Sequence, residues 1–409
     1  MEKILKAYKV ELAPNKVQVT KLKQNVGAAR WAYNWGLAQK IELHAKKEKS
    51  PNAIFLHREL NKLKQTEIPW MYESSKCSPQ EALRDLDKAF SNFFLRCKKG
   101  SKAKGFPKFK SKHSDKQSFR LTGTIKVSDQ YIQLPNLGKL KLKEFGYIPK
   151  DVKILSATVS LHASKWFVSV QVEEDAIEAP NPINDIIGVD LGIKMLATCS
   201  DGTTYENPKA LRKNLKKLKH QQRKLSKKTK KSKNYGKQKR KVAKLHYRIS
   251  SIRKDTLHKV TTKIINENQV IVIEDLAVSN MMKNHKLSQA ISDVGFYEFR
   301  IQLTYKAKWN NRTIIVANRF YPSSKMDCKS KVVNPNLKLS DRVIHHEDGT
   351  TTDRDLNAAI NLKNYYTESS SEINASGDEK FILEKSKRCS SMKEEFNLKH
   401  RVYLLKKQL

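Results

Sequence analysis

The amino-acid sequence predicts a mixed α/β protein of two or three domains. Short segments in which apolar and polar residues alternate, typical of strands, occur among longer segments with the apolar spacing of helices. An acidic, proline-containing linker, residues 173–185, separates two regions of different pattern. The chain has 409 residues, 38% of them hydrophobic, and is therefore long enough to bury a core in each region.

The first region, residues 1–180, is expected to combine strands and helices. Residues 4–12 alternate and stop at Pro14 and Asn15, which predicts a strand followed by a capped helix. This first helix is predicted to run to residue 37. Two further helices are predicted at about 56–65 and about 79–97. A basic loop with glycines, KKGSKAKGFPKFKSK, then leads into short strands that continue to about Val172.

The second region opens with IIGVDLGIKMLATCSDG (186–202), which predicts a buried strand, a glycine turn and a second strand. Further along, QVIVIEDL (269–276) and RTIIVAN (312–318) predict strands, and about 295–309 predicts a helix. A last helix, LNAAINL, follows an Asp-Arg-Asp triplet. The tail from about 366 is rich in serine and charge, so we expect little core there and partial disorder.

A strongly basic stretch lies between these strands. Residues 207–254 contain no acid, and their apolar residues recur at helical spacing: Leu211, Leu215, Leu218, Leu225, Val242, Leu245, Ile249 and Ile252. This pattern predicts two amphipathic helices that turn near Asn234, Tyr235 and Gly236. A charge run is often only a solvated helix face, but like charges at this density repel unless a polyanion neutralises them. We therefore predict nucleic-acid contact.

The overall charge supports the same class of partner. With 81 Lys+Arg against 41 Asp+Glu, the net charge of +40 exceeds what solubility requires. No apolar run approaches the roughly 18 residues of a membrane-spanning helix, and MEKILKAYKV lacks a signal-peptide core. The five cysteines are scattered and odd in number, unlike a disulfide framework. We expect a cytoplasmic protein, associated with the nucleoid if bacterial, with no membrane partner.

Three acids stand at chemically suggestive positions. Asp190 lies in an apolar strand, Glu274 ends another, and Asp355 opens the last helix. Each alone has a plain explanation: a lysine partner for Asp190, a wet strand end for Glu274, a helix cap for Asp355. Together they form an Asp, Glu, Asp set of hard oxygen ligands suited to Mg²⁺. Two such ions about 3.5–4 Å apart can support phosphodiester cleavage.

The ordered motifs resemble a known family. GVDLGIK, VIEDL, FYPSSK (320–325) and DRDLNAAINL are similar to those of the TnpB (OrfB-type) family of transposon-associated, RNA-guided DNA nucleases, relatives of type V CRISPR effectors. GAARWAYNWGL (27–37), SKCSPQEALRDLDKAFSNFF (75–94) and GFPKFK (105–110) extend the resemblance in family order across nearly the whole chain. It implies that Asp190, Glu274 and Asp355 are the catalytic triad, with Asp353 orienting the loop before Asp355.

The resemblance also implies a domain plan. Residues 1–180 would form an oligonucleotide-binding-type wedge β-barrel with an inserted helical recognition bundle at about 15–100. Residues 186–365 would form an RNase H-like RuvC nuclease domain, including the basic hairpin 207–267 and a zinc-ribbon segment 321–352. Residues 366–409 would be a polar tail. Within this plan, Lys76 and Gln80 are candidates for reading a short target-adjacent motif, and Lys227, Lys228, Lys230 and Lys231 for nucleic-acid contact.

The sequence departs from the family at the zinc ribbon, which normally carries two Cys-x-x-Cys pairs. The corresponding positions here are Asp327, Ser330, His345 and Asp348, so each expected thiolate is missing. Any site would have to combine Cys328, Asp327 and a histidine at unusual spacing. We therefore expect a degenerate ribbon without tightly bound zinc.

These observations predict an RNA-guided, Mg²⁺-dependent DNA endonuclease of an insertion-sequence-type transposon, of the kind often called transposases. Its expected partners are a guide RNA from the same locus and double-stranded target DNA, with one chain per RNA. Two alternatives stay open: a guided DNA-binding protein with weak or no cleavage, and a transposase that needs no RNA.

Overall fold

The computed structural model describes residues 3–101, 103–114, 117–175, 181–338 and 340–376. Its contacts divide the chain into two compact units, Met1–Ala176 with Lys228–Tyr247, and Ile177–Lys227 with Arg248–Leu409. Both units contain helices and strands, which confirms the mixed α/β class predicted from the sequence.

The first unit is built on two antiparallel sheets. In sheet order, the four-stranded sheet contains β1 (Lys3–Leu12), β7 (Lys165–Asp175), β6 (Lys153–His162) and β2 (Gln117–Leu121). The three-stranded sheet contains β3 (Lys126–Val127), β4 (Tyr131–Leu134) and β5 (Gly138–Lys141). An isolated bridge between Leu12 and Leu142 links the two, and their apolar faces share one core. The predicted alternation at residues 4–12 therefore matches a strand with one buried face.

Helices inserted between β1 and β2 also belong to this unit, together with Lys228–Tyr247. They are α1 (Lys16–Ala45), α2 (Ala53–Thr66), the 3-10 helix η1 (Pro69–Glu73) and α3 (Cys77–Lys98). The expected cap is present, because the Asn15 side chain accepts from the Gln18 backbone N–H and the Gln18 side chain accepts from the Asn15 N–H. These helices confirm the predicted positions, although α1 extends eight residues beyond the predicted end at residue 37.

The second unit contains a five-stranded mixed sheet. In sheet order its strands are β10 (Thr204–Glu206), β9 (Met195–Cys199), β8 (Asn184–Asp190), β11 (Asn268–Ile273) and β12 (Thr313–Val316). β8, β11 and β12 run parallel, whereas β9 and β10 are antiparallel. Because parallel strands end at the same edge, the residues that follow β8 and β11 are neighbours. That edge carries Asp190 and Glu274.

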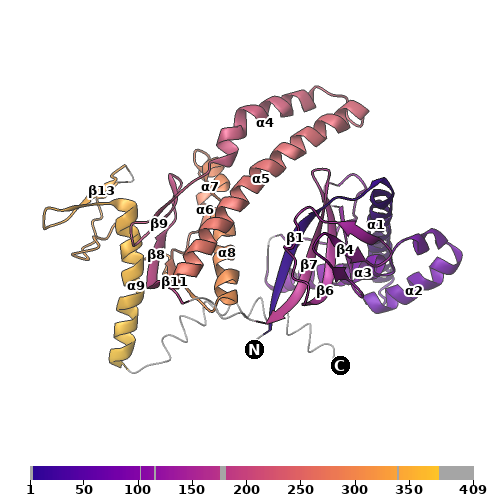
Figure 1. Ribbon diagram of the computed structural model, residues 1–409, viewed down its shortest axis with the longest axis horizontal. Coiled ribbons are helices and arrows are strands. Elements are labelled where there is room, and N and C mark those ends of the chain that lie inside the picture. Colours follow the sequence, from indigo (N-terminus) through magenta and orange to yellow (C-terminus); the bar gives the residue numbers. More distant parts are fainter. Residues whose placement is uncertain (1–2, 102, 115–116, 176–180, 339, 377–409) are drawn as a thin grey trace. The chain divides into compact units, whose positions relative to one another are not determined.

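Helices cover both faces of this sheet (Figure 1). On one face, Ile271 and Ile273 pack with residues of α5 (Lys233–Glu267) and α8 (Phe296–Trp309). On the other, Val272 packs with Leu362 of α9 (Arg354–Ser376). Successive residues of β11 thus point to opposite helical layers, which explains why VIVI (270–273) is apolar throughout rather than alternating. Shorter elements complete the unit: α4 (Ala210–Ser226), α6 (Val278–Met281), α7 (Ser288–Val294), β13 (Val343–His345) and β14 (Thr351–Asp353).

The basic stretch forms the two predicted helices, α4 and α5, but the predicted turn position is wrong. Asn234, Tyr235 and Gly236 lie within the first turn of α5, and residues 227–232 connect the helices instead. Two local features explain the shift: Lys231 has a positive φ of 68°, and the Ser232 hydroxyl accepts from the Tyr235 N–H at 3.0 Å as a helix cap. A glycine inside a helix carries only a modest cost, so it does not force a turn.

The polar tail expected from about residue 366 begins as a helix. The last helix α9 continues to Ser376, ten residues beyond the point where we expected the polar tail to begin. The rest of the predicted tail, 377–409, lies outside the described residues.

The contact between α9 and β8 leads to a prediction at Gly188. A Cβ built on Gly188 would overlap the carbonyl oxygen of Ala359 and lie 2.6 Å from the Lys363 nitrogen, both in the α9 backbone. Gly188→Ala should therefore lower the free energy of unfolding by about 1–3 kcal/mol, because α9 must move away from the sheet. Chemical denaturation of the purified protein would measure this change.

Gly236→Ala is the matched control, because a Cβ there meets no atom within 4 Å and the residue is helical. Alanine is favoured over glycine in helices by about 0.5–1 kcal/mol, so this variant should be unchanged or slightly more stable. Equal effects of the two substitutions would contradict the close approach at Gly188.

Candidate active site

Asp190 is the last residue of β8 and follows the fully buried Val189. It pairs with Thr198 of β9 in the sheet register and is itself half-buried. The buried part of the strand fixes the backbone, and the Asp190 carboxylate lies at the end of the strand, at the edge formed by the carboxyl ends of β8 and β11. The alternative explanation, a lysine partner for Asp190, is not found among the ion pairs of the described residues.

Glu274 directly follows β11 and accepts a 2.5 Å hydrogen bond from the hydroxyl of Ser323. The next acid, Asp275, has a different role, because Arg300 and Arg319 hold it in ion pairs of 2.7 and 2.5 Å. Burial alone would raise the pKa of Asp275, but these two guanidinium groups outweigh burial and lower it. Asp275 thus has a structural role in two ion pairs, whereas the donor to Glu274 among the described residues is the Ser323 hydroxyl.

Asp355 is the second residue of α9 and does not cap that helix. The cap is Asp353, whose carboxylate accepts from the backbone N–H of Asp355 at 2.9 Å and of Leu356 at 3.4 Å. The Asp355 side chain is 22% exposed and lies 3.8 Å from an Arg342 nitrogen. The plain explanation of Asp355 as a cap therefore does not hold, and its carboxylate is accessible to solvent.

The three acids are electrostatic neighbours although they are far apart in sequence. Burial raises the pKa of Asp190 well above its ordinary value of 3.8, and the carboxylates of Glu274 and Asp355 raise it further. Arg354 and the Leu191 backbone N–H offset part of this effect. Carboxylate oxygens are the donors that a hard divalent cation such as Mg²⁺ prefers, so the chemistry of these residues suits such an ion. Their oxygens do not all lie within 4.8 Å of one another in the described part of the chain.

Two buried asparagines on α9 connect the triad to the loop that follows β12. Asn361 donates to the carbonyl oxygens of Ser323 (2.8 Å) and Met326 (2.6 Å), and Asn357 donates to that of Met326 (2.7 Å). Both asparagines are fully buried. They hold the loop so that Ser323 meets Glu274, which gives a physical reason for the FYPSSK and LNAAINL motifs.

The sequence motifs contain Ser323, Asn357 and Asn361, but the sequence analysis predicted no role for these three residues. A signal was available, because two amides four residues apart lie on the apolar face of a predicted helix. Buried amides require partners, so such a pair indicates a docked loop.

The predicted ribbon positions do not form one ligand set. The Asp327 carboxylate lies 2.8 Å from Nδ1 of His346, whereas His345 is exposed on β13. Asp348 forms an ion pair with Lys329 at 2.6 Å, and Ser330 donates its backbone N–H to Asp327 while its hydroxyl accepts from the Val332 N–H. Of the two adjacent histidines, His346 turns inward and is buried, whereas His345 stays exposed.

Asp327, Cys328 and His346 do come together, since their ligand-type atoms lie within 4.8 Å of one another. This is the combination of Cys328, Asp327 and a histidine that the sequence left open. It lacks the four thiolate positions of the family's ribbon, and its Asp327 and His346 atoms are in direct hydrogen-bond contact. These residues do not fit the tetrahedral zinc site of the family.

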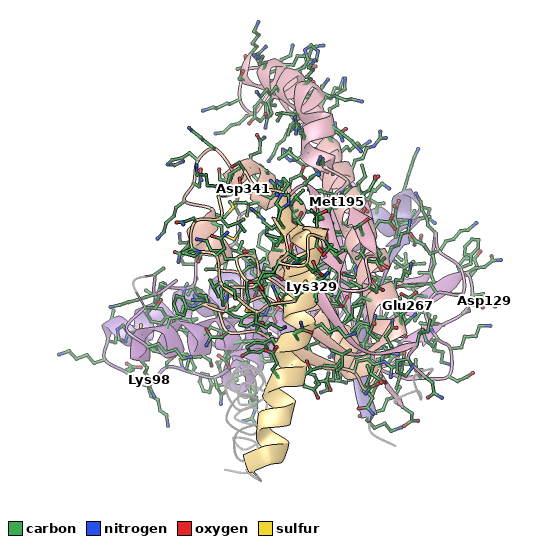
Figure 2. All side chains as sticks on the ribbon, turned by 90° about the vertical axis from the view of Figure 1, so that its left-hand side faces the viewer. Lys98, Asp129, Met195, Glu267, Lys329 and Asp341 are labelled. Atoms are coloured by element: carbon green, nitrogen blue, oxygen red, sulfur yellow. The ribbon has the colours of Figure 1, made fainter. Side chains whose placement is uncertain are left out.

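The proposed nucleic-acid contacts are accessible. Lys76 is exposed at the beginning of α3, and Gln80 lies one helical turn further on, partly exposed. The lysines 227, 228, 230 and 231 are all exposed in the connection between α4 and α5. Figure 2 shows nitrogen-tipped side chains projecting around these two helices.

Sequence profiles of known proteins match three parts of the chain. The profile described as "Probable transposase" matches residues 167–285, "Helix-turn-helix domain" matches 1–49, and "Cas12f1-like, TNB domain" matches 296–362. Together with the acid-bearing sheet, these matches define the class as transposon-encoded proteins of the OrfB type.

Curated relatives cover most of the chain. A "Putative RNA-guided DNA endonuclease" from Streptomyces pristinaespiralis is 34% identical over 366 residues, covering 88% of this chain and 89% of the relative. "Putative RNA-guided DNA endonuclease InsQ" from Escherichia coli (strain K12) is 34% identical over 378 residues, covering 88% and 92%. This chain belongs to the TnpB (OrfB-type) family of transposon-associated, RNA-guided DNA endonucleases.

The fold is similar to that of Cas12f1, which was solved by cryo-EM in complex with sgRNA and target DNA. The TM-score is 0.56 with 13% identity, covering 88% of this chain and 99% of Cas12f1. At this identity the similarity concerns the fold alone. Among the helices of the described residues, none is both long and apolar enough to cross a membrane.

The electrostatics at Asp190 generate a prediction about stability. Because the folded pKa exceeds the unfolded one, the stability that protonated Asp190 supplies is present below pH 3.8 and is lost as the pH rises through the raised folded pKa. Asp190→Asn removes the charge, so it should raise the melting temperature in buffer without divalent cations at neutral pH. The gain should disappear below pH 3.8.

Asp185→Asn provides the control, because Asp185 belongs to the same strand and is exposed. Its melting temperature should match that of the wild type across the same pH range. A lower melting temperature for Asp190→Asn at pH 7 would show that a cationic side chain, rather than repulsion, dominates at this position.

Proposed function

We propose that this chain is an RNA-guided, Mg²⁺-dependent DNA endonuclease encoded by an insertion-sequence-type transposon. The observation that carries the proposal is the gathering of Asp190, Glu274 and Asp355, close enough for two of them to raise the pKa of the third. Mutual repulsion of this kind is costly unless the site binds cations. The names of the curated relatives supply the expectation that the substrate is DNA and the guide is RNA.

The proposed catalytic roles follow from the contacts around each acid. Asp190, Glu274 and Asp355 would hold two Mg²⁺ ions, which when bound supply water activation and charge stabilisation for phosphodiester cleavage. The Ser323 hydroxyl, at 2.5 Å, orients Glu274 by occupying one of its oxygens. Asp353 fixes the first turn of α9 and so the position of Asp355. The absence of a side chain at Gly188 lets that helix lie against the strand that carries Asp190.

We assign the two units to the family's domain plan as a proposal. The sheets of residues 1–180 would be the wedge and α1 to α3 its inserted recognition bundle. The five-stranded sheet with its flanking helices would be the RNase H-like RuvC domain. A guide RNA and a target DNA duplex would be the partners of one chain, and the charge of +40 suits that polyanionic load. Lys76 and Gln80 would contact the target-adjacent motif.

The central experiment purifies the protein with RNA transcribed from its own locus and tests cleavage of matching DNA with and without Mg²⁺. Asp190→Ala, Glu274→Ala and Asp355→Ala should each reduce cleavage below detection while RNA and target binding persist, because each removes a cation ligand. Cleavage rates and filter-binding affinities measured on the same preparations would check both parts.

Asp353→Asn is the matched control beside Asp355, since an amide oxygen retains the helix cap. It should cleave at a rate near that of the wild type. Near-normal cutting by any of the three alanine variants would reject the triad. Target binding without cuts by the wild type would favour the guided DNA-binding alternative, and strand transfer without RNA would favour the RNA-independent transposase.

A second prediction concerns the lysines between α4 and α5. Replacing Lys227, Lys228, Lys230 and Lys231 by alanine should flatten the dependence of nucleic-acid affinity on salt. The slope of log K against log salt should fall by about 0.7–0.9 for each lysine that contacts a phosphate, because fewer counterions are released. Affinity for the guide RNA and for the RNA–DNA duplex would be measured over a range of salt concentrations.

The same four positions changed to arginine form the control, because the charge is kept. That variant should keep the wild-type slope. If the alanine variant also keeps it, these lysines do not contact the nucleic acid.

A further inference from the structure

The ribbon segment that precedes α9 contains two tight turns, one at each former Cys-x-x-Cys pair. In the first, the Asp327 N–H donates to Val332 O, and Lys331 N–H donates to Asp327 O, both at 3.0 Å. In the second, His346 N–H donates to Thr350 O at 2.9 Å, and Gly349, with φ of 78°, donates to His346 O at 3.1 Å. The turn geometry is therefore present without the thiolates. Lys329 and Asp341, labelled in Figure 2, belong to this segment.

A buried histidine links the two turns. Nδ1 of His346 lies 2.8 and 2.9 Å from the two Asp327 carboxylate oxygens, and Nε2 lies 2.7 Å from the Thr352 hydroxyl. A carboxylate only accepts, so Nδ1 carries a proton. Nε2 accepts from the Thr352 hydroxyl when the ring is neutral and donates to it when the ring is an imidazolium. His346 is 6% exposed, and both of its ring nitrogens have partners. Hydrogen bonds to charged groups in buried positions are among the stronger ones in proteins.

A second link is more exposed. Lys329 Nζ lies 2.6 Å from the Asp348 carboxylate and 2.6 Å from the Thr350 hydroxyl. The side chains of Lys329 and Asp348 are 48% and 51% exposed, and exposed ion pairs contribute little. The buried contact of Asp327, His346 and Thr352 is therefore the main connection, and we call these three residues the ribbon clasp.

The ribbon clasp is connected to the proposed active site at both ends. Next to Asp327, the Cys328 N–H donates to Asn357 of α9 at 2.8 Å, and Asn357 also holds Met326. Asn361 holds Met326 and Ser323, and Ser323 holds Glu274. At the other end, Thr352 directly precedes the capping residue Asp353. A shift of the clasp would therefore move the supports of both Glu274 and Asp355.

We propose that the ribbon clasp of Asp327, His346 and Thr352 replaces zinc as the structural link of the ribbon, and that these three are positioning residues for Glu274 and Asp355. The ribbon of this chain then holds its shape without zinc. The statement about Glu274 and Asp355 rests on the proposed function, whereas the statement about the ribbon does not.

The distances favour a direct clasp over a metal held by Asp327, Cys328 and His346. Two atoms bound to one tetrahedral zinc at about 2.0–2.2 Å lie about 3.3 Å or more apart. The contacts of 2.8 and 2.9 Å between His346 and Asp327 are instead of hydrogen-bond length. His346 would also have to give up its proton or its Thr352 contact to bind an ion.

The adjacent histidines provide a matched pair of variants. His346→Ala should lower the turnover rate of cleavage by about 10- to 100-fold, as loss of a group that orients a ligand does, with target affinity unchanged. His345→Ala, which changes an exposed neighbour, should stay within about twofold. His346→Asn, whose amide can donate to Asp327 as Nδ1 does, should recover part of the rate.

Two readouts need no cleavage. Elemental analysis of the wild type should find zinc far below one per chain, and a zinc-selective chelator in excess Mg²⁺ should leave its melting temperature unchanged. Hydrogen–deuterium exchange should show faster exchange of the amides of residues 326–353 in His346→Ala but not in His345→Ala.

Restoring the thiolates tests whether the ribbon clasp does the work of zinc. A variant with Asp327→Cys, Ser330→Cys, His345→Cys and Asp348→Cys, combined with His346→Ala, should bind zinc, and zinc should restore protection of 326–353. The chelator should then remove that protection, unlike in the wild type.

One tightly bound zinc per wild-type chain, lost together with ribbon protection on chelation, would overturn the proposal in favour of a metal site at Asp327, Cys328 and His346. Equal exchange in the two histidine variants would also overturn it. If the wild type proves unable to cleave DNA but the exchange and zinc results hold, the proposed function fails and the ribbon clasp stands.

Discussion

The close approach of α9 to β8 at Gly188 is the constraint on which the proposed active site depends. Any side chain at this position would overlap the helix backbone at Ala359, so only glycine lets the helix lie directly on the strand. That contact brings the beginning of α9, with Asp355, to the end of β8, with Asp190. Because β11 runs parallel to β8, its end carries Glu274 to the same edge. The approach of α9 and the parallel pairing of β11 thus bring Asp355 and Glu274 close enough to Asp190 to raise the pKa of its carboxyl.

The surrounding structure has to hold the acids near one another against their repulsion. Buried amide side chains contribute to this. Asn357 and Asn361 fasten the loop after β12 to α9 through backbone carbonyls, and that loop presents Ser323 to Glu274. Arg354 lowers the pKa of Asp190 against the larger effects of burial and of the other two acids. Hydrogen bonds therefore fix the site, although the negative charge of Asp190 is unfavourable there. This combination is expected of a functional site in which bound cations would balance the charge.

In the ribbon segment too, hydrogen bonds of buried polar side chains hold the backbone in place. The residues there differ from the zinc-binding cysteines of the family. Four thiolates in the family's ribbon would hold one ion, whereas here a buried histidine spans a carboxylate and a hydroxyl. A hydrogen-bonded contact is weaker than a zinc site, but this ribbon is also packed against α9 through Asn357. The loss of the cysteines therefore need not imply loss of the ribbon's structure or of the neighbouring triad.

The sequence by itself determined the mixed α/β class, the placement of most elements and the charge that calls for a polyanionic partner. These properties depend on local periodicity and composition, which a single sequence is enough to determine. It could also single out Asp190, because an acid in an apolar strand is costly wherever the strand lies, whereas Glu274 and Asp355 joined it as a catalytic triad only through the resemblance to the family's ordered motifs. Only the tertiary structure decided that Asp353 rather than Asp355 caps α9, that His346 rather than His345 turns inward, and that Gly188 admits a helix. Each of these depends on contacts between residues distant in sequence or on the direction of a side chain, and neither follows from spacing.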